Sequence, residues 1–125
     1  ITKRMDAKLT ITHPEGYELN SDITNGAYVT NDQNEAFKNA DFIYAKNWSS
    51  FNNYGKVLKK DLDWMITKSK MNLTNNAKFM HCLPIRRNVV ASDEVIDNNN
   101  SLILNQVENR IYSAQSVLKT IIENG

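Results

Sequence analysis

The sequence predicts a layered α/β/α domain with a mainly parallel, Rossmann-like sheet. Segments rich in β-branched and aromatic residues alternate along the chain with segments whose apolar residues recur at helical spacing. One apolar segment, Asp41–Ala45, shows no alternation, which is typical of a strand buried on both faces of a parallel sheet. The 125 residues, 41% of them hydrophobic, suffice for one core, so we expect residues 1–125 to form a single domain.

The first half of the chain predicts three strands separated by two short helices. The strands are expected at Leu9–His13, Ala27–Thr30 and Asp41–Ala45. The first helix should begin at a cap on Asn20 or Ser21 and end near Gly26. Asp32 and Glu35 have the spacing of a capping box, which predicts the start of the second helix.

The second half predicts two more strands and three helices. The strands are expected at Lys78–Leu83 and Ser101–Leu104. Helical spacing is found in the apolar set Leu58, Leu62, Met65 and Ile66. A short helix should begin at Ser92. The last helix ends near Gly125, and its apolar stripe consists of Val107, Ile111, Ala114, Leu118 and Ile121.

Composition excludes several classes of function. Fifteen Lys and Arg against fourteen Asp and Glu are too balanced for a nucleic-acid-binding surface. One cysteine excludes a disulfide framework and a thiolate zinc cluster, and it favours a reducing, cytoplasmic compartment. The sequence has neither a membrane-length apolar run nor a secretory signal. Because the chain begins with Ile1 rather than Met, we expect it to be part of a longer polypeptide.

Three segments follow predicted strands and should meet at one edge of the sheet, where α/β domains bind ligands. They are His13–Gly16, Lys46–Trp48 and Cys82–Arg87. Adjacent strand residues point to opposite faces, so His81 and Cys82 are not expected to form a catalytic dyad. A bend at Pro84 would expose the carbonyl groups before it as hydrogen-bond acceptors.

Four basic residues are candidates for anion binding. Arg86 and Arg87 form either a solvated pair or a guanidinium site for a carboxylate or phosphate. Lys46 is either a surface lysine or a ligand-binding cation. Arg110 is expected in the first turn of the last helix, where the helix dipole disfavours a cation, so it needs a bound anion or a carboxylate from elsewhere in the fold.

Taken together, these segments resemble the aspartate/ornithine carbamoyltransferase family. His81–Pro84 and the following Ile85–Asn88 resemble the family's HCLP signature, and Glu108–Arg110 is similar to the start of its last helix. Residues 12–19 and 40–48 look like the branch that acts on α-N-acylated ornithine, the N-acetyl- and N-succinylornithine carbamoyltransferases.

The resemblance implies the second, ornithine-binding domain of an enzyme of arginine biosynthesis. That enzyme moves the carbamoyl group of carbamoyl phosphate to the δ-amine of an N-acylated ornithine, as a homotrimer and without a metal or organic cofactor. By the same resemblance, the carbonyls of Cys82 and Leu83 hold the carbamoyl amide, Arg110 contacts carbamoyl phosphate, and Lys46 and Arg86 bind the acylornithine. The Ser-x-Arg-Thr and His-Pro-x-Gln motifs of the family's first domain are absent from this sequence.

Two further expectations rest on the resemblance. The Leu83–Pro84 peptide bond should be cis, and Lys46 replaces the acidic residue of plain ornithine carbamoyltransferases, which favours an acylated nitrogen over an α-ammonium. Two rival interpretations are a non-catalytic small-molecule-binding domain and an unrelated dinucleotide-binding domain. The second lacks its glycine fingerprint.

Overall fold

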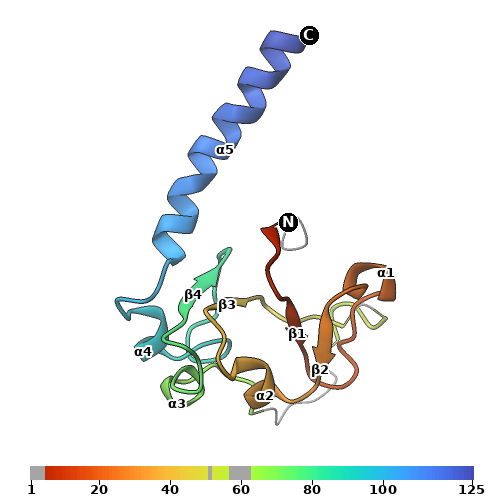
Figure 1. Ribbon diagram of the computed structural model, residues 1–125, viewed down its shortest axis with the longest axis vertical. Helices are drawn as coiled ribbons and strands as arrows, with labels where there is room; N and C mark the ends of the chain where they lie inside the picture. The colour runs from red at the N-terminus through yellow and green to blue at the C-terminus, as the bar shows by residue number, and fades with distance from the viewer. Residues whose placement is uncertain (1–4, 51, 57–62) are drawn as a thin grey trace.

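A computed structural model describes residues 5–50, 52–56 and 63–125 of the chain. Its elements, in chain order, are β1 (Thr10–Thr12), α1 (Ser21–Thr24), β2 (Tyr28–Thr30), α2 (Gln33–Phe37), β3 (Phe42–Ala45), α3 (Lys68–Met71), β4 (Lys78–His81), α4 (Asp93–Ile96) and α5 (Ile103–Asn124). Strands and helices alternate, which confirms the predicted α/β class. Figure 1 shows α5 projecting from a body that contains all the other elements.

The described strands pair in parallel, as predicted, but they form two separate sheets instead of one. β1 pairs with β2, and β3 pairs with β4. In the second sheet, Tyr44 lies opposite Met80 and Ala45 lies opposite His81. This register brings the carboxyl ends of β3 and β4 to the same edge.

Local capping explains where the two early helices begin. α1 follows Asn20, one of the two predicted caps, and α2 follows Asp32, whose carboxylate accepts a hydrogen bond from the backbone N–H of Glu35 at 3.1 Å. The second half of the predicted capping box is wrong. The Glu35 carboxylate accepts from the hydroxyls of Tyr28 (2.8 Å) and Thr30 (2.7 Å) instead, because β2 ends within reach of it.

The β3–β4 sheet has one buried face and one open face. Ile43 and Phe79 are 8% and 1% exposed and pack in the core, whereas Phe42 and Tyr44 are 63% and 55% exposed. The prediction that the Asp41–Ala45 strand is buried on both faces is therefore wrong. Its missing alternation reflects aromatic residues on the open face and not a second buried layer.

The buried face of this sheet is the centre of the hydrophobic core. The core residues lie in β3 and β4, in the helices α2 and α4, at the start of α5 and in the loops between these elements. They are Phe37, Ile43, Ala45, Ile66, Ala77, Phe79, Val90, Ala91, Val95 and Ile103.

At two places where the sequence predicts a longer element, the described residues form a single backbone bridge. Ser101 pairs only with Phe79, and α5 begins two residues later, so the predicted strand at Ser101–Leu104 is wrong. Ile66 pairs with Ala91, so the predicted helix does not include it. Leu58 and Leu62, the other part of that prediction, lie outside the described residues.

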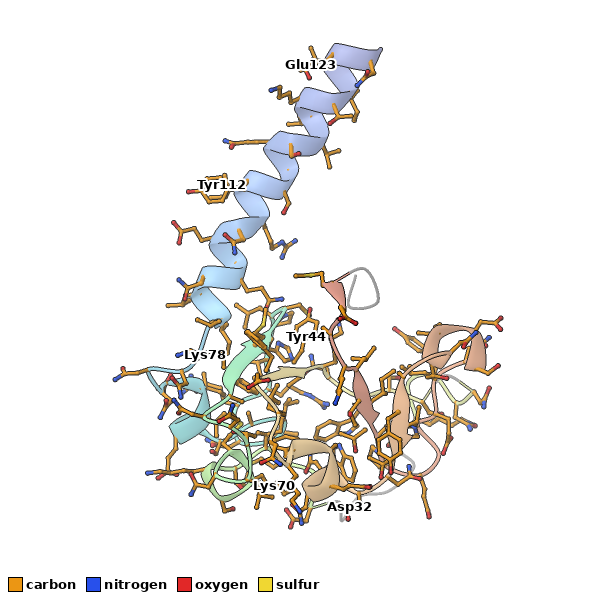
Figure 2. The ribbon with its side chains drawn as sticks, viewed as in Figure 1. Asp32, Tyr44, Lys70, Lys78, Tyr112 and Glu123 are labelled. Carbon is orange, nitrogen blue, oxygen red and sulfur yellow. The ribbon has the colours of Figure 1, made fainter. Side chains whose placement is uncertain are left out.

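The predicted last helix is confirmed, and most of its apolar stripe is open. Ile111, Leu118 and Ile121 are each more than half exposed, and Figure 2 shows the Tyr112 side chain standing away from the body. Among the described residues, no helix combines the length and the apolar composition that crossing a membrane requires.

Candidate functional site

Two of the three predicted ligand-edge segments meet where β3 and β4 end. The Lys46 Nζ atom lies 3.2 Å from Cys82 Sγ, and Asn47 Nδ2 donates to the Pro84 carbonyl at 3.0 Å. The third segment follows β1, which belongs to the other sheet. Its His13 carbonyl accepts from Asn31 Nδ2 at 2.8 Å, beside β2. The convergence of all three segments stays a prediction.

Strand alternation places Lys46 and Cys82 on the open face of the sheet. Tyr44 is on that face, and Lys46 follows it by two residues. His81 points the other way and is 1% exposed. The expectation that His81 and Cys82 form no dyad is therefore confirmed.

The Lys46–Cys82 contact changes the ionisation of both side chains. The hydrogen bond from the Lys46 ammonium lowers the pKa of the Cys82 thiol, and the Tyr44 hydroxyl acts in the same direction. The same hydrogen bond raises the pKa of Lys46. The pair is therefore biased toward an ammonium beside a thiolate.

His81 holds the turn that follows β4. Its Nδ1 atom accepts a hydrogen bond from the Leu83 backbone N–H at 2.9 Å. Burial, and then the nearby charge of Lys46, lower the pKa of His81, which keeps the ring neutral and Nδ1 free to accept. Leu83 has a φ of 55°, in the left-handed region, so this hydrogen bond supports a conformation that a leucine rarely adopts.

The Leu83–Pro84 peptide bond is cis, as predicted. Within the described part of the chain, no donor bonds to the carbonyl oxygen of Cys82 or of Leu83. Two acceptors are thus available at the strand edge, next to the Lys46 side chain.

The two adjacent arginines have different surroundings. Arg87 donates to Asp93 at 2.6 Å and makes a bidentate contact with Asp97, so it ties the turn to α4. Arg86 makes no ion pair with a described residue, and its guanidinium carbon lies 5.8 Å from the centre of the Trp48 ring. The pair therefore divides between two roles. Arg87 is a structural residue, and Arg86 is the candidate guanidinium site for a carboxylate or phosphate.

Arg110 is not in the first turn of its helix, which corrects the prediction. α5 begins at Ile103, so Arg110 is its eighth residue and lies beyond the reach of the dipole's positive end. Gln106, one turn earlier, donates to the Tyr44 hydroxyl at 3.2 Å. Residues four apart share a helix face, so Arg110 lies on the side of α5 that faces the β3–β4 edge. No described carboxylate pairs with it.

Sequence reasoning assigned no individual role to three residues of this site. Tyr44 lies between Lys46 and α5, Gln106 fixes α5 against it, and Asn47 binds the Pro84 carbonyl. Two of them had a signal: Asn47 belongs to the predicted ligand-edge segment Lys46–Trp48, and Tyr44 precedes Lys46 by two residues in a predicted strand and therefore shares its face.

Replacing Lys46 by Met should make the Cys82 thiol less reactive. Without the ammonium, the pKa of Cys82 rises toward the ordinary thiol value of about 8.5, and less thiolate is present at pH 7. The measurement is the rate of iodoacetamide labelling between pH 5 and 10, which reports one site because the chain has one cysteine. Lys38→Met, which also removes a lysine, should leave the pH midpoint of Cys82 labelling unchanged. An unchanged midpoint in Lys46→Met would contradict the contact.

The α/β fold, with two carbonyls at a strand edge that accept from no described donor, defines a ligand-binding domain of the α/β class. More specifically, the chain belongs to the aspartate/ornithine carbamoyltransferase family. The family's sequence model for the Asp/Orn binding domain matches residues 1–121.

Two relatives illustrate the similarity to enzymes named for acylated ornithine. The chain is 49% identical over 120 residues to the N-succinylornithine carbamoyltransferase of Bacteroides thetaiotaomicron, covering 94% of this chain and 38% of that protein. It is 35% identical over 99 residues to the N-acetylornithine carbamoyltransferase of Xylella fastidiosa, covering 74% of this chain and 30% of that protein. The chain thus spans well under half of the length of these relatives.

Solved structures show the same fold. An acetylornithine transcarbamylase in complex with acetylcitrulline has a TM-score of 0.80 and 28% identity, covering 94% of this chain and 40% of that one. An N-acetyl-L-ornithine transcarbamylase variant with carbamyl phosphate and N-succinyl-L-norvaline also has a TM-score of 0.80, at 28% identity, covering 94% of this chain and 41% of that one.

Proposed function

We propose that residues 1–125 are the ornithine-side domain of an enzyme that transfers the carbamoyl group of carbamoyl phosphate to an N-acylated ornithine. The observation that carries the proposal is the β3–β4 edge, where the Cys82 and Leu83 carbonyls, which accept from no described donor, follow the strand beside the Lys46 cation. The acceptor is N-succinylornithine in preference to N-acetylornithine, because relatives with the succinyl name are 48–49% identical and those with the acetyl name are 33–35% identical.

In the proposed reaction, this domain positions the substrates and forms no covalent intermediate. The Cys82 and Leu83 carbonyls accept hydrogen bonds from the carbamoyl NH₂ group, and Arg110 contacts the phosphate. The deprotonated δ-amine attacks the carbamoyl carbon, the bond to the phosphate oxygen breaks, and the amine loses its second proton. The contribution to rate is orientation and charge stabilisation.

Lys46 favours an acylated substrate. Its ammonium sits at the edge where the acceptor must lie, and it would repel the α-ammonium of free ornithine. An amide nitrogen carries no charge, and an acyl carboxylate is attracted to a cation. Together with Arg86, Lys46 gives this edge two cations for the carboxylates of an acylated amino acid.

The proposal includes the cellular setting that the resemblance implies. The enzyme would be cytoplasmic, act in arginine biosynthesis, assemble as a homotrimer and need no metal or organic cofactor, nucleic acid or membrane. In the described residues, no three His, Cys, Asp or Glu side chains are grouped as a metal site would require.

The purified 125-residue chain should show no turnover of carbamoyl phosphate with N-succinylornithine, because the sequence has no phosphate-binding loop of the first domain. A chimera in which this chain replaces the matched 120 residues of the Bacteroides thetaiotaomicron relative should be active. Succinylated, acetylated and free ornithine are each supplied as the acceptor, and the carbamoylated product is measured by mass spectrometry.

Three results would contradict this assignment in different ways. Turnover by the chain alone would show that it holds a complete active site. A folded chimera that binds acylornithine without turnover would favour the non-catalytic binding domain. A chimera that prefers free ornithine would overturn the proposed role of Lys46.

A further inference from the structure

The dipeptide that follows Lys46 makes two contacts with the turn after β4. Asn47 donates its side-chain amide to the Pro84 carbonyl, and the Trp48 ring lies beneath the Arg86 guanidinium. These contacts link residues that are 37 and 38 positions apart in the sequence. They connect both ends of the Pro84–Arg86 segment to two adjacent residues.

Trp48 can serve as a fixed support because its own position is set by the core. The side chain is half-buried and packs against the core cluster, whereas Arg86 is exposed. An exposed arginine has many rotamers, and ordering it normally costs conformational entropy. Arg87 is ordered by Asp93 and Asp97, but Arg86 has no such carboxylate partner among the described residues. The indole face is therefore the group that orients the Arg86 guanidinium.

We propose that Asn47 and Trp48 are positioning residues that hold the Arg86 guanidinium ready for a carboxylate of the acylated amino acid. This inference rests on the proposed function. Stacking on an aromatic face leaves the edge of the guanidinium, with its paired N–H groups, free for a bidentate contact. Asn47 fixes the turn at Pro84, so that the arginine two residues later starts from a defined backbone position.

A positioning role through Arg86 predicts which kinetic constants change. Trp48 touches neither of the substrates in this arrangement, and its removal loosens one contact to the acceptor. Ground-state and transition-state binding of that carboxylate are weakened alike, so KM for the acylornithine rises while kcat and KM for carbamoyl phosphate stay near their starting values.

The contact itself can be tested on the 125-residue chain, independently of any activity. In ¹⁵N-labelled protein, the Arg86 Nε–H signal should be shifted upfield by the indole ring current, with Arg86→Lys providing its assignment. Trp48→Leu should abolish the shift, Trp48→Phe should retain most of it, and Trp64→Leu should leave it in place. Absence of the shift in the wild type would overturn the inference, whatever the fate of the proposed function.

The role is tested by steady-state kinetics of the chimera with N-succinylornithine. Trp48→Leu should raise KM for the acceptor about two- to fivefold, the range for an exposed cation–π contact, and Trp48→Phe should restore it. In an Arg86→Met background, Trp48→Leu should have no further effect. An equal rise in that background, or a fall in kcat with a rise in KM for carbamoyl phosphate, would show a general structural role and overturn the inference. An inactive wild-type chimera would count against the proposed function, and the NMR result would then decide the Arg86–Trp48 contact.

Discussion

Arg110→Met should lower kcat/KM for carbamoyl phosphate in the chimera by about 30- to 1000-fold while leaving the fold intact. The loss corresponds to about 2–4 kcal/mol, the usual cost of removing one charge-assisted contact to a reacting anion. Folding should suffer little because Arg110 is exposed, pairs with no described carboxylate and lies in mid-helix, where Met is an equally good helix former. The measurement is initial rate against carbamoyl phosphate concentration, with circular dichroism to follow folding.

Lys119→Met is the matched control for this substitution. Lys119 is on the same helix, and among the described residues its ammonium pairs with the neighbouring Glu123, at 3.7 Å. Removing it should change the rate less than twofold, since exposed pairs of this kind contribute little. If Arg110→Met saturates normally with carbamoyl phosphate but unfolds at lower temperature, Arg110 is a structural residue and the proposed phosphate contact is wrong.

Short-range signals in the sequence were reliable where the chain satisfies them locally. The cap residues Asn20 and Asp32 begin the helices that they predict, because a side-chain oxygen reaches a backbone N–H two or three residues away. The cis bond at Pro84 also agreed with the resemblance. These features depend on neighbouring residues or on a motif and not on the rest of the fold.

Burial and register could not be predicted in the same way. The Asp41–Ala45 strand has an apolar sequence, yet Phe42 and Tyr44 are exposed, because exposure depends on what lies over each face. The position of Arg110 was wrong for a related reason. The segment beginning at Ser101 has strand-like composition, but after one bridge to Phe79 it turns into α5, which moves the helix start several residues toward the N-terminus.

The candidate site shows which of its residues the sequence can and cannot identify. Lys46, Cys82 and Arg86 could be placed at one edge because parallel strands end together. The sequence does not show which side chains meet there. Lys46 contacts Cys82, 36 positions away. Arg86 differs from Arg87 in lying over the Trp48 ring and in having no carboxylate partner among the described residues. Such contacts depend on tertiary packing, which local patterns do not encode.

Phe79→Ala should lower the free energy of unfolding by about 3–5 kcal/mol, the usual cost of removing a large buried aromatic side chain. Phe79 is 1% exposed at the centre of the core, and its backbone also bonds to Asn100 and Leu102, so the site has little room to collapse. A domain of this size has only about 5–15 kcal/mol in total. Urea unfolding of the chain, followed by circular dichroism, measures the loss.

Phe42→Ala is the matched control, since it removes the same side chain from the open face of the paired strand. Phe42 is 63% exposed, so its loss should cost less than about 1 kcal/mol. Equal losses in the two variants would show that the assignment of buried and open faces is wrong. That outcome would matter for the site as well, because the same alternation places His81 in the core with Phe79 and turns Cys82 toward Lys46. A large loss for Phe79 and a small loss for Phe42 would therefore support both the core and the face on which the proposed substrates bind.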